Sequence, residues 1–251
     1  MNGIVYPMLA IFGMLLTSIL WGRLIMRPGF DSDRRLPAIY LSGLIGALLG
    51  AKIVYMLAEG WTLWPMYTED PAIVWQEWFT GKTVTGALFG GYLSVELAKK
   101  LLNYPRATGD LFAVLAPIGL GLGRVGCWAQ GCCLGITQNA GWWTITDTHG
   151  AHRWPSVQIE LLFNVSLFAF ALVCWRRRMF EGQLFHIYLI AYGLFRFGHE
   201  FARATPNILG PISGYQIAAL CILALGALRY RQRSRENPMS PQLTTPATEQ
   251  G

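Results

Sequence analysis

Charged residues are scarce in this sequence of 251 residues, where Asp, Glu, Lys and Arg together make up 14%. A typical soluble domain carries about 25%. So little charge cannot cover a surface that faces water on every side, which argues against an ordinary soluble protein. Hydrophobic residues reach 53% instead and gather in long runs. About 20 apolar helical residues cross a hydrocarbon layer of about 30 Å, so the expected class is an all-α integral membrane protein.

Three further features are missing from the sequence. No basic tract alternates with stacking aromatic residues, so nucleic acid is not an expected partner. No internal repeat is visible. No positively charged segment precedes the first apolar run, which begins after "MNGI". We therefore expect a retained first helix rather than a cleaved signal peptide.

The apolar runs predict seven transmembrane helices. They are expected over 4–24, 37–57, 84–102, 107–128, 157–175, 183–202 and 209–229. We expect one membrane domain over 1–235, with a small external hairpin insertion at 131–156. The Pro-rich polar segment 236–251 is expected to be a disordered tail.

The net charge of +6 is distributed unevenly and predicts the orientation. Basic residues gather in the odd-numbered connections and after the last run: Arg23, Arg27, Arg34, Arg35, Lys99, Lys100, Arg106, Arg176, Arg177, Arg178, Arg229, Arg231, Arg233 and Arg235. Because cytoplasmic connections carry the excess of Lys and Arg, the C-terminus is expected in the cytoplasm and the N-terminus outside.

An unusual stretch, "GLGLGRVGCWAQGCCLG" (119–135), ends the fourth run at the expected outer face. Small residues spaced at four, such as Gly119 and Gly123, favour close helix packing in a bilayer. For Gly126, Gly131 and Gly135 we favour a close backbone approach to a ligand, or a positive φ where the helix ends. The following segment 139–156 has aromatic and β-branched residues on both sides of "THG", which predicts a short hairpin at the membrane surface.

Polar residues recur at similar depth in the fourth, fifth and sixth runs. Arg124 is followed by Glu160, and "YGLFRFGHEFAR" (192–203) adds more charges. Arg196 and Glu200 are four residues apart and share a helical face, which Arg203 extends. Two interpretations stay open. The set could be an interhelical ion-pair network, or its arginines could hold an anionic lipid headgroup, because planar guanidinium donors suit phosphate.

These stretches resemble the prolipoprotein diacylglyceryl transferase family. Its Gly-Arg-x-Gly-Asn-Phe-x-Asn-Gly-Glu-x-x-Gly signature is similar to "GRVGCWAQGCCLG" (123–135), and its His-Pro-Ser-Gln-Leu-Tyr-Glu resembles "WPSVQIE" (154–160). Its Tyr-Gly-x-x-Arg-Phe-x-x-Glu-Phe-x-Arg matches 192–203 throughout. Tyr6 in "VYPML" and "TGALFG" (85–90) resemble two shorter family stretches, with Thr85 in place of a histidine. The resemblance covers about 1–230.

The resemblance implies an enzyme of the bacterial cytoplasmic membrane that acts at its outer face. It would transfer the diacylglyceryl group of phosphatidylglycerol to the thiol of a prolipoprotein lipobox cysteine. Its partners would be phosphatidylglycerol, the prolipoprotein signal peptide and membrane lipids, with no metal and no organic cofactor. The implied catalytic residues are Arg124, Glu160, Arg196 and Glu200. The implied substrate-binding residues are Tyr6, Thr85, Gly126, Gln130, Gly135, Tyr192 and Arg203.

This sequence departs from the family pattern at several places. Cys127 and Gln130 stand where the family has Asn, and Cys132 stands where it has Glu. Thr85 cannot act as the base that a histidine could supply. Two alternatives to the main interpretation therefore stay open. One is a divergent lipid-group transferase with another acceptor, and the other is a non-catalytic membrane protein whose Cys-rich outer loop handles redox chemistry or metal.

Cys127, Cys132 and Cys133 do not follow from a phosphate site, and four interpretations are open for them. Cys127 could form a disulfide with Cys132 or Cys133, or one thiol could replace the missing carboxylate in catalysis. The cysteines could bind zinc together with His149 or His152, although only the cysteines have a compact spacing. They could also be inert. Two more cysteines, Cys174 and Cys221, lie in apolar runs and are expected in the core.

Overall fold

The structure is a computed structural model that describes residues 5–25, 33–63, 72 and 81–236. Within this part, seven α-helices overlap the seven ranges expected from the sequence. They are α1 (Val5–Ile25), α2 (Leu36–Ala58), α5 (Val84–Leu101), α6 (Gly109–Gln130), α7 (Ser156–Arg176), α8 (Leu184–Glu200) and α9 (Gly214–Glu236). A short 3₁₀ helix, η1 (Gly60–Leu63), follows α2. The expected tail over 236–251 lies outside the described residues except for Glu236, which ends α9.

Four of these helices are long and apolar enough to cross a membrane, judged by length and composition among the described residues. The four segments are Pro7–Leu24, Leu36–Ala58, Gly109–Gln130 and Ser156–Arg176. Large apolar side chains also cover the outside of the bundle, and Leu49, Leu57 and Leu162 are each more than half exposed. A helix that is apolar on its outer face as well as its inner face is typical of a membrane protein.

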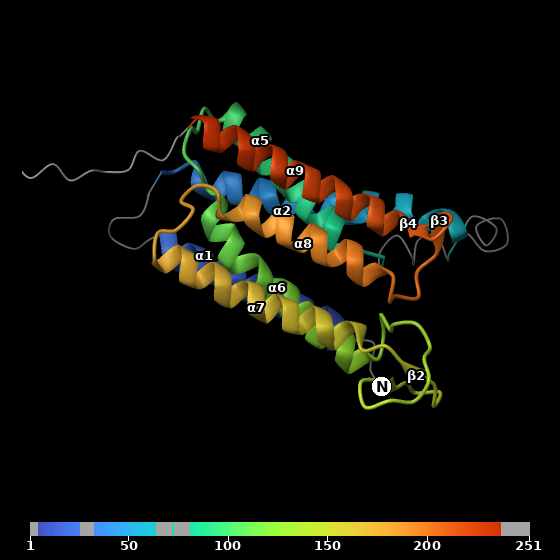
Figure 1. Cartoon of the computed structure of the whole chain (residues 1–251). Helices are drawn as coiled ribbons and strands as arrows, with labels where there is room; N and C mark the ends of the chain where they lie inside the picture. Colours follow the sequence, from blue (N-terminus) through green and yellow to red (C-terminus); the bar gives the residue numbers. More distant parts are fainter. Residues whose placement is uncertain (1–4, 26–32, 64–71, 73–80, 237–251) are drawn as a thin grey trace, which may run out of the picture.

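The helices form an elongated bundle in which α1, α6 and α7 lie together on one side and α2, α5, α8 and α9 on the other (Figure 1). The most extensive packing joins α2 to α5, where glycines let the two backbones approach closely. A Cβ atom at Gly50 would meet the backbone of Gly86 and Gly90, and one at Gly86 would meet Gly50. Small residues at such crossings are a common way to pack helices in a bilayer, where lipid offers no hydrophobic driving force.

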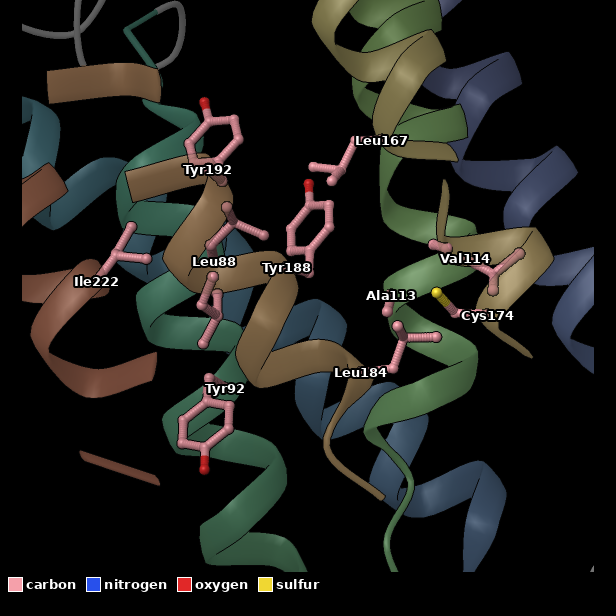
Figure 2. Packing of buried hydrophobic residues seen from close by; sticks show 12 residues of the cluster. Leu88, Tyr92, Ala113, Val114, Leu167, Cys174, Leu184, Tyr188, Tyr192 and Ile222 are labelled. Carbon is pink, nitrogen blue, oxygen red and sulfur yellow. The ribbon is translucent and has the colours of Figure 1, made fainter. Parts of the chain in front are cut away.

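The largest core cluster joins α5 to α9 through the middle of the bundle. Tyr188, Leu189 and Ile222 are at most 2% exposed, and Figure 2 shows Tyr188 between its own helix and the helices that carry Ala113 and Leu167. Cys174 belongs to this cluster, as expected. Cys221 does not, because its position on α9 turns the side chain to the outside of the bundle. The expectation that Cys221 is a core residue is therefore wrong.

The expected hairpin is present between α6 and α7. Strand β1 (Ile145–Thr146) pairs antiparallel with β2 (His152–Arg153), with Ile145 opposite Arg153. Asp147 closes the turn: its Oδ1 accepts the backbone N–H groups of His149 and Ala151, each at 2.9 Å, and its Oδ2 accepts Arg153 Nε at 2.7 Å. The Arg153 side chain and these two backbone donors lower the pKa of Asp147 below its ordinary value.

A second hairpin, β3 (Asn207–Leu209) with β4 (Ile212–Ser213), precedes α9 and is not expected from the sequence. The seventh run was expected to start at 209, whereas α9 starts at Gly214. Gly210 has a φ of +56° and Pro211 follows it, so the chain turns here before it can form a helix. Both hairpins lie at the same end of the bundle (Figure 1).

Candidate functional site

Three arginines from three parts of the chain converge on one buried carboxylate, Glu160 of α7, at the hairpin end of the bundle. Arg196 on α8 and Arg203 just after α8 each donate from Nη1 to Glu160 Oε1 at 2.7 Å. Arg124 on α6 forms an ion pair with the other oxygen, Oε2. Glu160 is 2% exposed. A single carboxylate thus joins α6, α7 and α8.

A second carboxylate, Glu200, supports the arginines from behind. Its Oε2 lies 2.6 Å from Arg196 Nη2 and 3.7 Å from Arg203 Nε, as expected for residues on one helical face. Thr205 donates to its other oxygen at 2.7 Å. Three arginine charges against two carboxylate charges leave one positive charge in excess (3 − 2 = 1). A buried excess charge is unfavourable unless a counter-charge approaches it, so this cluster favours an anion.

A cavity of about 1100 Å³ opens beside the cluster and gives an anion access to it. Arg124, Arg196 and Arg203 line one end, together with Gln130. The cavity then continues between α1, α2, α5 and α6, where its walls are mostly apolar: Ala47, Leu48, Leu88, Phe112, Leu115, Ala116 and Leu120. Charged residues also line the far part of the cavity, where Glu96, Lys99 and Arg233 lie. An apolar channel that leads to a cluster of arginines suits an amphiphile with an anionic headgroup.

The glycines at the end of α6 shape the loop around the site. Gly131 caps the helix with a φ of +68°, which glycine adopts without the strain that a side chain would add. Gly135 has another role: a Cβ atom there would lie 2.6 Å from the carbonyl oxygen of Trp154 and 2.7 Å from Ser156 Oγ. The loop therefore packs directly against the start of α7, and Ile136 N–H donates to the Ala202 carbonyl at 3.0 Å.

The other three glycines for which the sequence predicts a role have different outcomes. Gly126 is buried inside α6 and has no positive φ, so only the alternative of a close backbone approach to a ligand stays a prediction there. Gly123 was expected to pack against a neighbouring helix, but a Cβ atom there would meet nothing within 4 Å, and the residue lines the cavity. Gly119 does pack as expected, since its added Cβ would lie 3.5 Å from Thr17 of α1.

Cys127, Cys132 and Cys133 are free thiols that lie together at the cavity wall. Cys133 Sγ is 3.8 Å from Cys127 Sγ and 3.5 Å from Cys132 Sγ. A disulfide needs about 2.05 Å, so the bridge from Cys127, one of the four open interpretations, is not formed in this structure. The three sulfurs lie within 4.8 Å of one another. In the described part of the chain, neither His149 nor His152 joins this group.

Several expected substrate-binding residues do not line the cavity. Thr85 is 1% exposed and shares a hydrogen bond of 2.5 Å with Thr83, which lines the cavity in its place. Tyr192 is 3% exposed and acts electrostatically on Arg124 and Arg196 without reaching the cavity wall. Tyr6 lies in α1, but its side chain is outside the described part of the structure.

The sequence analysis did not identify some residues of the site. His199 lies 3.7 Å from Glu160 Oε1 and 3.2 Å from the Ser156 carbonyl. Its position three residues after Arg196 is the signal that could have identified it. Arg153 lines the cavity and donates to Gly135 O at 3.4 Å. Glu59 also lines the cavity and accepts a hydrogen bond from Tyr215. These two residues are 156 positions apart in the chain, so no local sequence pattern indicates their contact.

Comparison with known proteins gives one consistent family. The family model for prolipoprotein diacylglyceryl transferase matches residues 4–230. A protein of Clostridium perfringens named phosphatidylglycerol--prolipoprotein diacylglyceryl transferase 2 is 28% identical over 87% of this chain and 86% of its own. Proteins of Aeromonas salmonicida and Aeromonas hydrophila named phosphatidylglycerol--prolipoprotein diacylglyceryl transferase are 29% and 30% identical, each over 89% of this chain and 83% of their own. The match extends over all seven described helices except the end of α9, and the chain belongs to the prolipoprotein diacylglyceryl transferase family.

Proposed function

We propose that this protein transfers a diacylglyceryl group from phosphatidylglycerol to the thiol of a lipobox cysteine in a prolipoprotein. The observation that carries the proposal is the excess positive charge of Arg124, Arg196 and Arg203 around Glu160, at the end of a long apolar cavity. Family membership and the names of the relatives support it. A phosphate would meet the arginines while the acyl chains occupy the apolar walls.

The chemistry needs two things from the protein. A sulfur–carbon bond forms at the glycerol carbon while the bond between that carbon and the phosphate oxygen breaks, so glycerol phosphate leaves with both electrons of that bond. The negative charge that grows on the leaving phosphate is stabilised by the arginines, which Glu160 and Glu200 hold in place. The acceptor must react as a thiolate. Thr85, bonded to Thr83 and buried, does not supply a base.

We place the reaction at the outer face of the bacterial cytoplasmic membrane, in one membrane domain with seven spans. The basic helix ends support this orientation because they gather at one end of the bundle, where Lys99, Lys100 and Arg233 surround a common depression. Glu160 lies at the start of α7 and Arg196 near the end of α8, and these helix ends and both hairpins lie at the other end (Figure 1). The signal peptide of the prolipoprotein would reach the arginine end from the membrane.

Two measurements test the proposal. The gene should restore growth of a bacterial strain depleted of its own diacylglyceryl transferase. The purified protein in phosphatidylglycerol nanodiscs should lipidate a lipobox peptide and release glycerol phosphate, whereas the same peptide with Cys→Ser should remain unmodified. Normal folding and phosphatidylglycerol binding without lipidation of any lipobox peptide would contradict the proposed acceptor.

A further inference from the structure

Cys127, Cys132 and Cys133 form a compact group that the transfer of a lipid does not by itself explain. Cys127 is buried in the last turn of α6, and Gly131 reverses the chain directly after it. The N–H of Cys132 donates to the Cys127 carbonyl at 3.1 Å. Cys133 has a φ of +62°, which is uncommon for a residue other than glycine. The loop thus takes a conformation that directs three sulfurs to one place.

The spacing of the sulfurs fits a tetrahedral ion. Zinc bonds to thiolate sulfur at about 2.3 Å, which separates two sulfur ligands by about 3.8 Å. The distances from Cys133 Sγ to the other two sulfurs are 3.8 and 3.5 Å, and all three lie within 4.8 Å. A disulfide would use two of the three thiols and leave one unpaired, whereas a metal ion uses all three.

A guanidinium group lies beside the sulfurs. Arg124 Nη1 lies 3.9 Å from Cys127 Sγ. Three thiolates around one Zn²⁺ carry a net charge of −1 (2 − 3 = −1), two fewer negative charges than the three thiolates without the ion. All three cysteines also line the cavity that the arginines line, so the open side of such a site faces the substrate.

We propose that Cys127, Cys132 and Cys133 bind Zn²⁺, and that its fourth position takes the thiol of the acceptor cysteine. Three protein ligands with one open position are the pattern of catalytic rather than structural zinc. The assignment of the acceptor rests on the proposed function. The expectation of no metal came from the resemblance, and the site departs from the family at two of these positions, where Cys127 and Cys132 replace Asn and Glu.

The step balances without any redox change. The acceptor thiol displaces a water molecule from the zinc and loses its proton to solvent, because a thiol bound to zinc is held as the thiolate. The zinc-bound sulfur then attacks the glycerol carbon, and glycerol phosphate leaves toward the arginines. The product is a neutral thioether, a weaker ligand than a thiolate, so water returns to the metal. This route supplies the thiolate that Thr85 cannot produce.

Metal analysis of the purified full-length chain tests the site directly. We expect about one zinc per chain, and at least about a 10-fold loss of zinc affinity in each of Cys127→Ser, Cys132→Ser and Cys133→Ser. The control is Cys221→Ser, an exposed cysteine on another helix that should leave the zinc content unchanged. The zinc content should also fall when wild-type protein is treated with a chelator, and it should return to about one per chain when zinc is added back. This repeats the test without any substitution. A chain that takes up no zinc, or that keeps a disulfide in this loop with zinc present, would overturn the proposal.

Cobalt tests the open position. Co²⁺ in place of zinc should show sulfur-to-cobalt charge-transfer absorption, which should change when a lipobox peptide binds and not when its Cys→Ser analogue binds. An unchanged spectrum with the cysteine peptide would overturn the acceptor role. The two proposals fail in different ways. Full lipid transfer by metal-free protein would refute the zinc step and leave the transferase standing, whereas a zinc site that responds to thiols without lipid transfer would refute the transferase.

Discussion

Arg203 and Glu160 lie 43 residues apart in the chain, and their side chains meet at 2.7 Å, from Nη1 to Oε1. Arg196 shares the same oxygen at the same distance. One carboxylate therefore holds two arginines beside each other, while its second oxygen holds Arg124. The arginines depend on Glu160 for their position. We therefore expect loss of an arginine to weaken lipid binding, and loss of the carboxylate to destabilise the fold.

Replacing Arg124 or Arg196 should weaken phosphatidylglycerol binding and lipid transfer. The loss of one charge-assisted contact should cost about 1.5–3 kcal/mol in binding, with a larger effect on the transition state. Arg→Lys keeps the charge and loses the planar fork, so it should not restore function. Both arginines would contact one phosphate. The loss of binding free energy in the double Ala variant should therefore be much smaller than the sum of the losses in the two single variants. Binding and transfer in nanodiscs measure these effects.

The control for the arginine variants is Arg176→Ala, an exposed residue at the opposite end of α7. It should bind and transfer like the wild type. Normally folded Arg124→Ala and Arg196→Ala proteins with wild-type binding and transfer would show that these arginines serve only as ion-pair partners of Glu160 and Glu200.

Glu160→Gln should destabilise the fold, because it removes the negative charge from among three buried arginines. Breaking a buried ion pair on one side costs about 3–5 kcal/mol. The matched control is Glu181→Gln. Glu181 lies 3.9 Å from Arg178 with its side chain 66% exposed, so that change should fall within about 0.5 kcal/mol. Thermal unfolding of the two variants in the same detergent measures the difference, and equal stability would contradict the central role of Glu160.

Gly50→Ala should loosen the packing of α2 on α5. The added Cβ would meet the Gly86 carbonyl oxygen and lie 2.8 Å from Gly90 Cα, and backbone atoms cannot move aside. Such overpacking costs about 1–3 kcal/mol. Gly22→Ala on α1 is the control, because its Cβ would meet nothing within 4 Å, and the greater helix preference of alanine should stabilise the protein by up to about 1 kcal/mol. A thermal shift that is the same for both variants would refute the close approach of α2 and α5.

Acid should loosen the β1–β2 hairpin through Asp147. Its pKa in the folded protein is below the ordinary value of 3.8 because of Arg153 and two backbone donors. A lowered folded-state pKa means that the stabilisation is complete above about pH 4 and is lost as the pH falls through the folded-state pKa. Hydrogen exchange of the peptide 145–153 in wild type and Asp147→Asn, compared at each pH, measures this. The two proteins should differ at pH 6 and converge in acid, and a constant difference would exclude Asp147 as the titrating group.

The basic connections predict a cytoplasmic C-terminus. A reporter protein that functions only in the cytoplasm should therefore be active when it is fused after Arg235. The partner experiment places a reporter in the hairpin at Gly150, where only an externally active reporter should work. Activity of an external reporter at Arg235 would contradict the seven-span arrangement.

The sequence by itself determined where the helices lie and which residues share a helical face. A helix satisfies its own backbone hydrogen bonds between near neighbours, so an apolar run of sufficient length is enough to predict it. For the same reason the pairing of Arg196 with Glu200 could be predicted from their spacing of four. The hairpin at 139–156 followed from its local turn residues. The second hairpin was missed because the apolar run at 209–229 predicts one helix, although Gly210 and Pro211 mark a turn at its start.

Only the tertiary structure decided which residues from different helices meet. Glu160 receives three arginines, Thr83 rather than Thr85 faces the cavity, and Cys221 points outward. These outcomes depend on the rotation of each helix about its axis and on how closely it approaches its neighbours. Contacts such as that of Gly50 with Gly86 set this geometry. No spacing within one helix contains that information, because such a contact needs both helices in place.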